Sequence, residues 1–255
     1  IITGMEDILR SHGYATIVCD CRTDKKLERE AVEFLIRRRV DGIINMPVDE
    51  TGAHLKRFQK TGQPIVLIDR RIQGIPCDSV LVDNQKAAEE AVELFIEKGH
   101  RNIGIIGGPE GIFTAEERLT GYCTALEKAG ISIKNSLVYR GDYTIKGGVR
   151  GLEELVRNNP DMTAVFVTNY EMTMGAMIGV NELGIQVPGQ LSMIGFDNLP
   201  FARACRPKLT IVSQPTDGIA REVARIMLER LEKREAGSEE PFMEKLQTEI
   251  MEGKS

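Results

Sequence analysis

Several features that mark large classes of protein are missing from this chain of 255 residues. No apolar run approaches the roughly 18 residues that a membrane-spanning helix needs. The chain has only three histidines, His12, His54 and His100, and they lie far apart in the sequence. The five cysteines are scattered, odd in number, and lie in or beside apolar segments. This pattern favours free thiols in a reducing compartment over a zinc site, so we expect no bound metal and no contact with a membrane.

Motifs for catalysis and for cofactor binding are also missing. Gly107-Gly108-Pro109 lacks the Lys-Ser/Thr pair of a phosphate-binding loop, and no Gly-x-Gly-x-x-Gly follows an expected strand. No serine lies in a nucleophile-elbow pattern. We therefore expect no catalytic residue and no cofactor, and we do not expect an enzyme.

The charge and the N-terminal residues bear on partners and location. The formal net charge of -5 argues against a general binder of nucleic acid or of anionic membranes. The first residues lack the basic and apolar stretches of a secretory signal, although a mature secreted protein would have lost one. Together with the cysteine pattern, this favours a cytoplasmic protein.

What the sequence does contain is an alternation of short β-rich runs and amphipathic helical runs. The pattern is clearest where the apolar runs Ala164–Val167 and Leu191–Gly195 flank a helical run, Tyr170–Leu183. Two strands joined through a helix are parallel. Further strands are expected at residues 15–20, 40–45, 64–68, 79–82, 102–106, 136–139, 209–213 and 241–250, and further helices at residues 4–11, 24–39, 51–61, 85–98, 115–129, 145–158 and from 216 onward.

The order of these segments predicts an α/β fold with two open parallel sheets. The runs 64–68 and 79–82 follow each other without a helix, whereas a closed eight-fold barrel needs a regular repeat. We assign residues 1–99 and 215–238 to an N-terminal subdomain, and residues 100–214 and 239–255 to a C-terminal subdomain. Open parallel sheets bind ligands beyond the carboxyl ends of their strands, so we expect a ligand crevice between the two subdomains.

Polar residues at strand ends are the candidates for contacting a small polar ligand. Asn169 and Asp197 follow the two strands that flank the central helical run. A carboxylate only accepts hydrogen bonds and suits paired sugar hydroxyls or an amine, whereas an amide both donates and accepts, which suits a neutral polyol. Either residue could instead be a turn-former that bonds to its own backbone.

Two further residues stand near the same expected edge. Arg118 lies in the first turns of the helix expected at residues 115–129, after a Gly-Gly-Pro break and a polar loop, where its guanidinium could bind vicinal hydroxyls or a carboxylate. The alternative is a surface arginine that pairs with Glu116 or Glu117. Tyr143 lies just past a strand end and could stack on a sugar ring or a base, although a half-buried loop tyrosine is the commoner case.

Several stretches together resemble one protein family. They are residues 40–44, 64–70, 82–84, 99–109, 117–122, 187–198, 209–215 and 248–255. In this order they resemble the effector-binding core of bacterial transcriptional repressors of the LacI/GalR type. The resemblance covers nearly the whole chain.

The resemblance implies a fold, a ligand and partners. The family fold is a periplasmic-binding-protein-like pair of subdomains (type I) joined by three crossovers, with a small-molecule effector, often a carbohydrate, between them. The domain usually dimerises side by side, and the helix Tyr170–Leu183, with methionines on its exposed side, resembles part of that homodimer interface. The family's DNA-binding helix-turn-helix and its first strand have no counterpart in this sequence, so operator DNA would be bound only through that missing N-terminal part.

The resemblance also assigns ligand contacts. Arg118, Asn169, Asp197 and Gln214 match family ligand contacts. Tyr143 matches an aromatic that often stacks on the ligand, Thr114 lies in a contacting loop, and Asn45 lies at a contacting strand end. Phe196 and Lys86 are further possible contacts. Lys86 stands near a position that is acidic in some sugar-responsive members, and with Arg118 it could favour a phosphorylated or carboxylated ligand.

The first functional hypothesis is therefore the effector-sensing domain of a transcriptional regulator, in which closure of the subdomains is coupled to DNA binding. The second is an exported sugar-binding protein of a transporter, which shares the fold. The five cysteines and the missing export signal count against the second hypothesis. A third, an enzyme of the open α/β class, needs a nucleophile or cofactor motif that the sequence lacks.

Overall fold

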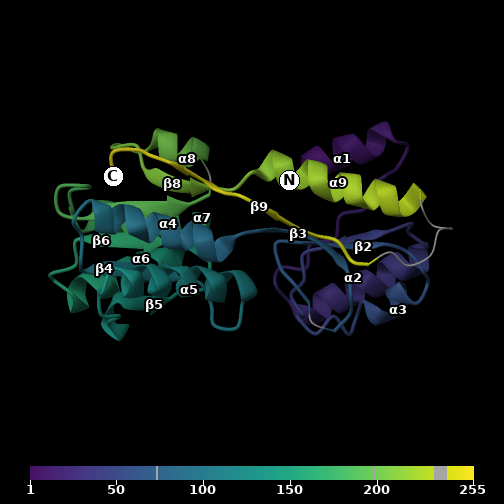
Figure 1. The fold of residues 1–255 in the computed structure, drawn as a ribbon, viewed down its shortest axis with the longest axis horizontal. Helices are drawn as coiled ribbons and strands as arrows, with labels where there is room; N and C mark the ends of the chain where they lie inside the picture. Colours follow the sequence, from purple (N-terminus) through teal and green to yellow (C-terminus); the bar gives the residue numbers. More distant parts are fainter. Residues whose placement is uncertain (73, 198, 233–239) are drawn as a thin grey trace. The chain divides into compact units, whose positions relative to one another are not determined.

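The computed structural model describes residues 1–72, 74–197, 199–232 and 240–255 (Figure 1). The chain forms two compact units. Unit 1 contains Ile1–Val82 and Pro215–Leu246, and unit 2 contains Asp83–Gln214 and Gln247–Ser255. Helices and strands alternate along the chain, and each unit is built on a mostly parallel sheet. The predicted α/β class is confirmed.

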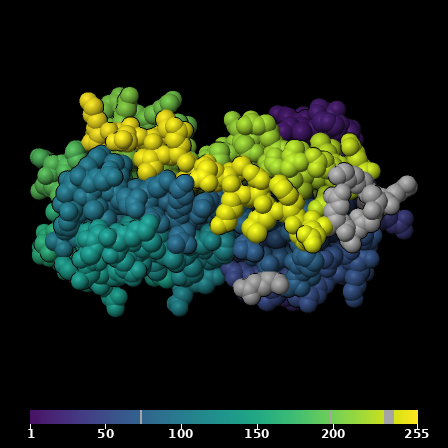
Figure 2. Space-filling view, in the orientation of Figure 1, coloured from purple at the N-terminus to yellow at the C-terminus, as the bar shows by residue number. Residues whose placement is uncertain are grey.

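The sheet of unit 1 has four parallel strands in the order β1-β2-β3-β9. These strands are β1 (Ile43–Asn45), β2 (Ile65–Ile68), β3 (Asp78–Val82) and β9 (Met243–Leu246). Successive residues of β2 face opposite layers, as the pleat requires. Val66 and Ile68 pack with α1 (Ile2–Ser11) and α9 (Thr216–Glu232), whereas Ile65 and Leu67 pack with α2 (Lys25–Arg38) and the residues around α3 (Lys56–Gln59). Figure 2 shows α1 (purple) against α9 (yellow-green) on the surface of unit 1.

The sheet of unit 2 has six strands in the order β10-β8-β7-β6-β4-β5. They are β4 (Ile103–Gly107), β5 (Val138–Arg140), β6 (Ala164–Val167), β7 (Ser192–Phe196), β8 (Thr210–Ser213) and β10 (Glu249–Met251). All pairs are parallel except β10 with β8. Because helices cover both faces, the central strands are buried throughout and read as continuous apolar runs.

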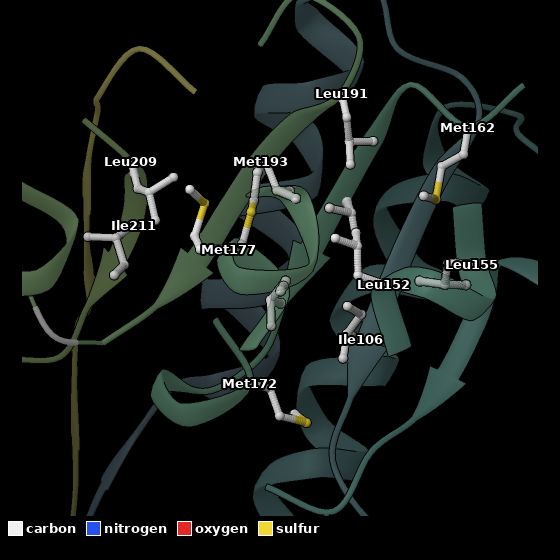
Figure 3. Packing of buried hydrophobic residues seen from close by; sticks show 14 of the residues in the cluster. Ile106, Leu152, Leu155, Met162, Met172, Met177, Leu191, Met193, Leu209 and Ile211 are labelled. Atoms are coloured by element: carbon white, nitrogen blue, oxygen red, sulfur yellow. The ribbon is translucent and has the colours of Figure 1, made fainter. Parts of the chain in front are cut away.

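Two pairs of helices cover these faces. On one face, α4 (Asn84–Glu97) and α5 (Phe113–Lys128) pack on Ile103, Ile105 and Phe166. On the other, α6 (Ile145–Asn158) and α7 (Tyr170–Glu182) pack on Val165 and on Ile106, which Figure 3 shows beside Leu152 of α6. A short 3₁₀ helix (Asn135–Leu137) precedes β5, and α8 (Leu199–Ala204) precedes β8.

Two of the three methionines of α7 are buried. Met172 is 0% exposed and Met177 is 8% exposed, and both belong to the core cluster with Leu152 and Met193 (Figure 3). The expectation of methionines on the exposed side of this helix is therefore wrong for Met177, and Met174 is half-buried. A wide apolar face is needed here because α7 packs against both α6 and the sheet.

Three expected strands or helices differ from the structure. Residues 15–20 pair with no strand in the described part of the chain, and Ile17 and Val18 are 51% and 63% exposed. The helix expected at 51–61 shrinks to the four residues of α3, since the Asp49 side chain accepts hydrogen bonds from the Thr51 backbone and hydroxyl and forms a turn there. The expected edge strand 241–250 is two strands, β9 in unit 1 and β10 in unit 2.

The boundaries between the two units also differ from those expected from the sequence. We assigned α4 to the N-terminal subdomain, with a boundary at residue 99, but the boundary lies between Val82 and Asp83. The reason is that Ala88, Val92 and Phe95 of α4 pack on the sheet of unit 2. Residues 240–246, assigned to the C-terminal subdomain, belong to unit 1 because β9 pairs with β3. The expected boundary at 238–239 lies outside the described residues.

The contact between α6 and α7 depends on glycines at which backbone meets backbone. A Cβ at Gly148 would lie 2.3 Å from the carbonyl oxygen of Met172, and a Cβ at Gly175 would lie 2.0 Å from that of Ile145. A backbone oxygen cannot move aside as a side-chain tip can. The two helices therefore approach this closely only because these positions carry no side chain.

We expect Gly148→Ala to lower the free energy of unfolding by about 1–3 kcal/mol, although alanine favours a helix by roughly 1 kcal/mol. The matched control is Gly179→Ala in α7, where a Cβ would lie 3.1 Å from the flexible Cδ2 of Leu152. Chemical denaturation of the two variants and the unmodified chain measures the effect. Equal stability of the two variants would show that the close backbone contact between α6 and α7 does not make Gly148 harder to replace than Gly179.

Candidate functional site

The carboxyl ends of five neighbouring parallel strands in unit 2 meet at one edge of the sheet. The strands lie in the order β8-β7-β6-β4-β5. The residues that follow them are Gln214, Asp197, Asn169, Gly108 and Tyr143, respectively, either directly or within three residues. Ligands of open parallel sheets bind at this edge. The topology therefore brings most of the predicted site residues to one side of unit 2.

Arg118 is buried at the centre of this group. It is 4% exposed, its Nε donates to Asn84 Oδ1 at 2.8 Å, and its Nη1 donates to the Thr168 carbonyl oxygen at 2.5 Å. Its guanidinium carbon lies 3.7 Å from the centroid of the Phe196 ring, a cation–π contact. Both hydrogen-bond acceptors are neutral oxygens. The alternative of a surface arginine paired with Glu116 is wrong, because Arg118 is buried and Glu116 pairs with Arg140.

Asp197 and Gln214 are joined by their side chains. Gln214 Nε2 donates to both carboxylate oxygens of Asp197, at 2.9 and 2.8 Å. Asp197 has φ of +64°, in the left-handed region that Asp and Asn tolerate better than most residues. Its backbone N–H donates to the Val212 carbonyl at 2.7 Å. The ends of β7 and β8 are thereby linked through one carboxylate.

Tyr143 and Thr114 form a second contact at the same edge. The tyrosine ring lies on the backbone of Gly108, where an added Cβ would be 2.3 Å from the ring carbon Cζ. Thr114 Oγ1 is 3.5 Å from the Tyr143 hydroxyl. Thr114 is 3% exposed and lies one helical turn before Arg118 on α5. The first two turns of α5 therefore hold both predicted residues beside the strand ends.

Asn169 and Lys86 differ in their surroundings. Asn169 is the N-cap of α7, and its Oδ1 accepts a hydrogen bond from the Met172 N–H at 3.0 Å. The Asn169 oxygen therefore bonds to its own backbone neighbourhood, as the turn-forming alternative predicts. The amide nitrogen of Asn169 makes no hydrogen bond within the described residues.

Lys86 has a side chain that is 54% exposed, and its Nζ contacts Glu90 at 3.6 Å and Gln247 at 3.3 Å. None of these contacts joins Lys86 to Arg118.

Asn45 lies in unit 1, at the end of β1. Its Nδ2 donates to Glu28 Oε1 at 3.0 Å. The Glu28 carboxylate is 1% exposed and also accepts the backbone N–H groups of Val48 (3.1 Å) and Asp49 (2.8 Å). His54 Nε2 lies 3.3 Å from Glu28 Oε1, at ion-pair distance, although neither ring nitrogen makes a well-aligned hydrogen bond within the described part of the chain.

Burial alone would raise the pKa of Glu28. The His54 ring, the Asn45 amide and the N–H groups of Asp49 and Val48 outweigh burial, and the net pKa lies below its usual value. Glu28 is therefore a charged, buried acceptor that fixes the loop after β1.

Sequence reasoning missed three residues of these networks: Asn84, Thr168 and Glu28. Asn84 is 0% exposed and Thr168 is 0% exposed, and both bind Arg118. Asn84 and Thr168 each stand next to a strand end, which was the available signal. Glu28 carried no sequence signal for a buried role, since an acidic residue in a charged helix normally faces solvent.

Neither a metal site nor a membrane helix is found in the described residues. No group of three or more His, Cys, Asp or Glu there could hold a metal ion, and no helix is long and apolar enough to cross a membrane. A cavity of about 180 Å³ in unit 1 is lined by Leu67, Ile75, Cys77, Phe242 and other residues. None of the predicted site residues lines it.

Comparison with known proteins places this architecture in a family. The family described as "Periplasmic binding proteins and sugar binding domain of LacI family" matches residues 1–244. The chain belongs to the LacI family. It is 32% identical over 248 residues to the HTH-type transcriptional repressor CytR of Escherichia coli (strain K12), a match that covers 96% of this chain and 72% of CytR.

Comparison with solved structures agrees. A complex of the transcriptional regulator CelR with cellobiose is 29% identical, with a TM-score of 0.89, and the match covers 100% of this chain and 77% of CelR. A LacI-family regulator of Enterococcus faecium with bound ribose is 26% identical, with a TM-score of 0.87. This match covers 100% of this chain and 91% of the regulator's chain. This LacI-family chain therefore corresponds to the effector-binding domain of transcriptional repressors, which are not enzymes, and this assignment is favoured over an exported binding protein.

We expect the stability of the protein to depend on ionisation of Glu28. A lowered folded-state pKa contributes stability above the unfolded-state value of about 4.5, and this contribution is lost as the pH falls through the folded-state pKa. In Glu28→Gln, the stability of the folded protein should therefore fall less steeply with decreasing pH below about pH 5 than in the unmodified chain. Thermal melting of the whole chain between about pH 6 and pH 3 measures this, with the exposed Glu30→Gln as control. An unchanged acid profile in Glu28→Gln would contradict it.

Proposed function

We propose that the strand-end residues of unit 2 bind a small neutral carbohydrate, or a closely related polyol, as the effector of a transcriptional regulator. The observation that carries the proposal is the buried Arg118, which is oriented by Asn84, Thr168 and Phe196 and, among the described residues, makes no ion pair with a carboxylate. A guanidinium that is held by neutral oxygens keeps its charge available to polarise ligand oxygens. The relatives with bound cellobiose and ribose support the ligand class.

The roles of the other residues follow from their chemistry. Asp197 supplies two acceptor oxygens for paired hydroxyls, and Gln214 orients that carboxylate. Asn169 offers its amide nitrogen as a donor, because its oxygen caps α7. Tyr143 offers a ring face against which a sugar can stack, with Thr114 beside it. Asn45 in unit 1 is proposed as a further contact, and Phe196 acts through Arg118.

Lys86 is not assigned to the ligand. Its exposed ammonium group contacts Glu90 and Gln247, and none of its contacts in the described residues joins it to Arg118. A phosphorylated or carboxylated ligand therefore has less support than a neutral one. The experiments below therefore compare the binding of two neutral sugars with the binding of a sugar phosphate.

In the complete regulator, we propose that the effector acts in the cytoplasm on a homodimer whose N-terminal heads bind operator DNA. A ligand changes DNA affinity only by its difference in affinity for the DNA-binding and the released states. The alternative, an exported binding protein of a transporter, predicts tight sugar binding without any effect on DNA.

A thermal-shift screen tests the ligand class. D-ribose, cellobiose and D-ribose 5-phosphate are added to the chain, and a ligand at a hundredfold excess over its Kd should stabilise the folded state by about 2.7 kcal/mol. We expect a shift with at least one neutral sugar. A shift with the phosphate ester alone would contradict the neutral-ligand proposal.

Asp197→Asn tests the site itself. Asparagine tolerates the left-handed backbone and can still accept the hydrogen bond of Gln214, so we expect a stability change below about 1 kcal/mol. It removes one of two acceptors, so we expect sugar affinity to fall at least about tenfold. Isothermal titration measures this, and the exposed Asp161→Asn in the same unit is the matched control. Equal affinities of the two variants would remove Asp197 from the site.

A further inference from the structure

One buried carboxylate in unit 1 holds a whole strand-end loop. Glu28 lies in the first turn of α2, is 1% exposed, and receives hydrogen bonds from three residues of the segment that follows Ile44. These donors are the side chain of Asn45 and the backbone N–H groups of Val48 and Asp49, at 3.0, 3.1 and 2.8 Å. The family resemblance gave no role to this residue.

The chemistry of this contact decides which way the Asn45 amide faces. The oxygen and nitrogen of an amide have nearly the same shape, so their assignment rests on the hydrogen-bond network. An ionised carboxylate only accepts hydrogen bonds. Two backbone N–H groups and the nearby His54 ring all favour the ionised form of Glu28. Asn45 must therefore turn its NH₂ group toward Glu28.

The opposite side of the amide is then an acceptor. Asn45 is half-buried, and its Oδ1 makes no hydrogen bond with the described residues. If Glu28 were neutral, its protonated oxygen could donate to Oδ1, and the amide could be inverted. The ionisation of Glu28 thus determines whether the free edge of Asn45 accepts or donates.

We infer that Glu28 is a specificity-determining positioning residue, which fixes Asn45 so that its carbonyl oxygen is offered to a ligand. This inference rests on the proposed function, in which Asn45 contacts the effector. The ligand group at Asn45 must then be a donor, such as a hydroxyl or an N–H group. A phosphate or carboxylate oxygen there would meet the partial negative charge of Oδ1 and would be disfavoured.

The first arm of the test needs no ligand. In ¹⁵N-labelled protein, the side-chain NH₂ signal of Asn45 reports its hydrogen bond to Glu28. Glu28→Gln keeps the size of the side chain but can donate as well as accept, so we expect the Asn45 signal to shift and its protection from hydrogen exchange to fall. The matched control is Glu30→Gln, an exposed residue on the same helix, which should leave the signal unchanged. An unchanged Asn45 signal in Glu28→Gln overturns the inference.

The second arm measures selectivity by isothermal titration with D-ribose, cellobiose and D-ribose 5-phosphate. In Glu28→Gln we expect the preference for the neutral sugar over the phosphate ester to fall roughly tenfold, and in Glu30→Gln to stay unchanged. If Glu28→Gln does not fold, Asn45→Ala takes its place, since it leaves Glu28 its two backbone donors. Unchanged selectivity in the folded variant overturns the inference.

The two arms separate the inference from the proposed function. If no probe binds the unmodified chain, the proposed function is contradicted, and with it the ligand role of Asn45. The amide signal then still decides whether Glu28 fixes the side chain. If a neutral sugar binds and Asp197→Asn abolishes binding, but Glu28→Gln changes neither signal nor selectivity, only the inference fails.

Discussion

Parallel strand pairing is the constraint on which the rest of this structure depends. Each parallel pair needs a connection that returns the chain to the same end of the sheet, and in unit 2 helices supply it. In unit 2 these helices cover both faces of the sheet, so the central strands β4, β6 and β7 are buried throughout and apolar. Their carboxyl ends are the places where polar residues can stand together without cost to the core. In unit 2, five such ends lie side by side, and the contacts of Arg118, Asp197 and Tyr143 all follow from that arrangement.

Each unit has a buried charged side chain beside its strand ends, Arg118 in unit 2 and Glu28 in unit 1, whose hydrogen-bond partners in the described residues are neutral, although His54 Nε2 lies 3.3 Å from Glu28 Oε1. In unit 2 the cation Arg118 binds two neutral oxygens and an aromatic ring, and in unit 1 the anion Glu28 binds an amide and two backbone N–H groups. A buried charge without partners would be strongly destabilising, and a fully compensating counter-charge would leave little field for a ligand. Neutral partners fix the geometry of the charged group and preserve its charge.

The sequence allowed the fold class, most strands and the strand-end residues of unit 2 to be predicted, because hydrophobic periodicity and turn residues are local signals. It could not place residues 15–20 or divide 241–250 into two strands, because strand pairing is a tertiary property. The assignment of α4 failed for the same kind of reason, since an amphipathic helix such as Asn84–Glu97 does not reveal which sheet it covers. Arg118 was found as a candidate, but its partners Asn84 and Thr168 were not, and neither was Glu28. These are contacts between residues 17 to 50 positions apart.

The interleaved composition of the two units has a consequence for biosynthesis. The sheet of unit 1 is completed by β9, which begins at Met243, and the sheet of unit 2 is completed by β10, which begins at Glu249. A ribosome must therefore synthesise the chain beyond Met243 before the sheet of unit 1 can be completed, and beyond Glu249 before the sheet of unit 2 can be. Neither half can be finished ahead of the other, so an interruption late in translation leaves two unfinished sheets instead of one complete unit and one fragment.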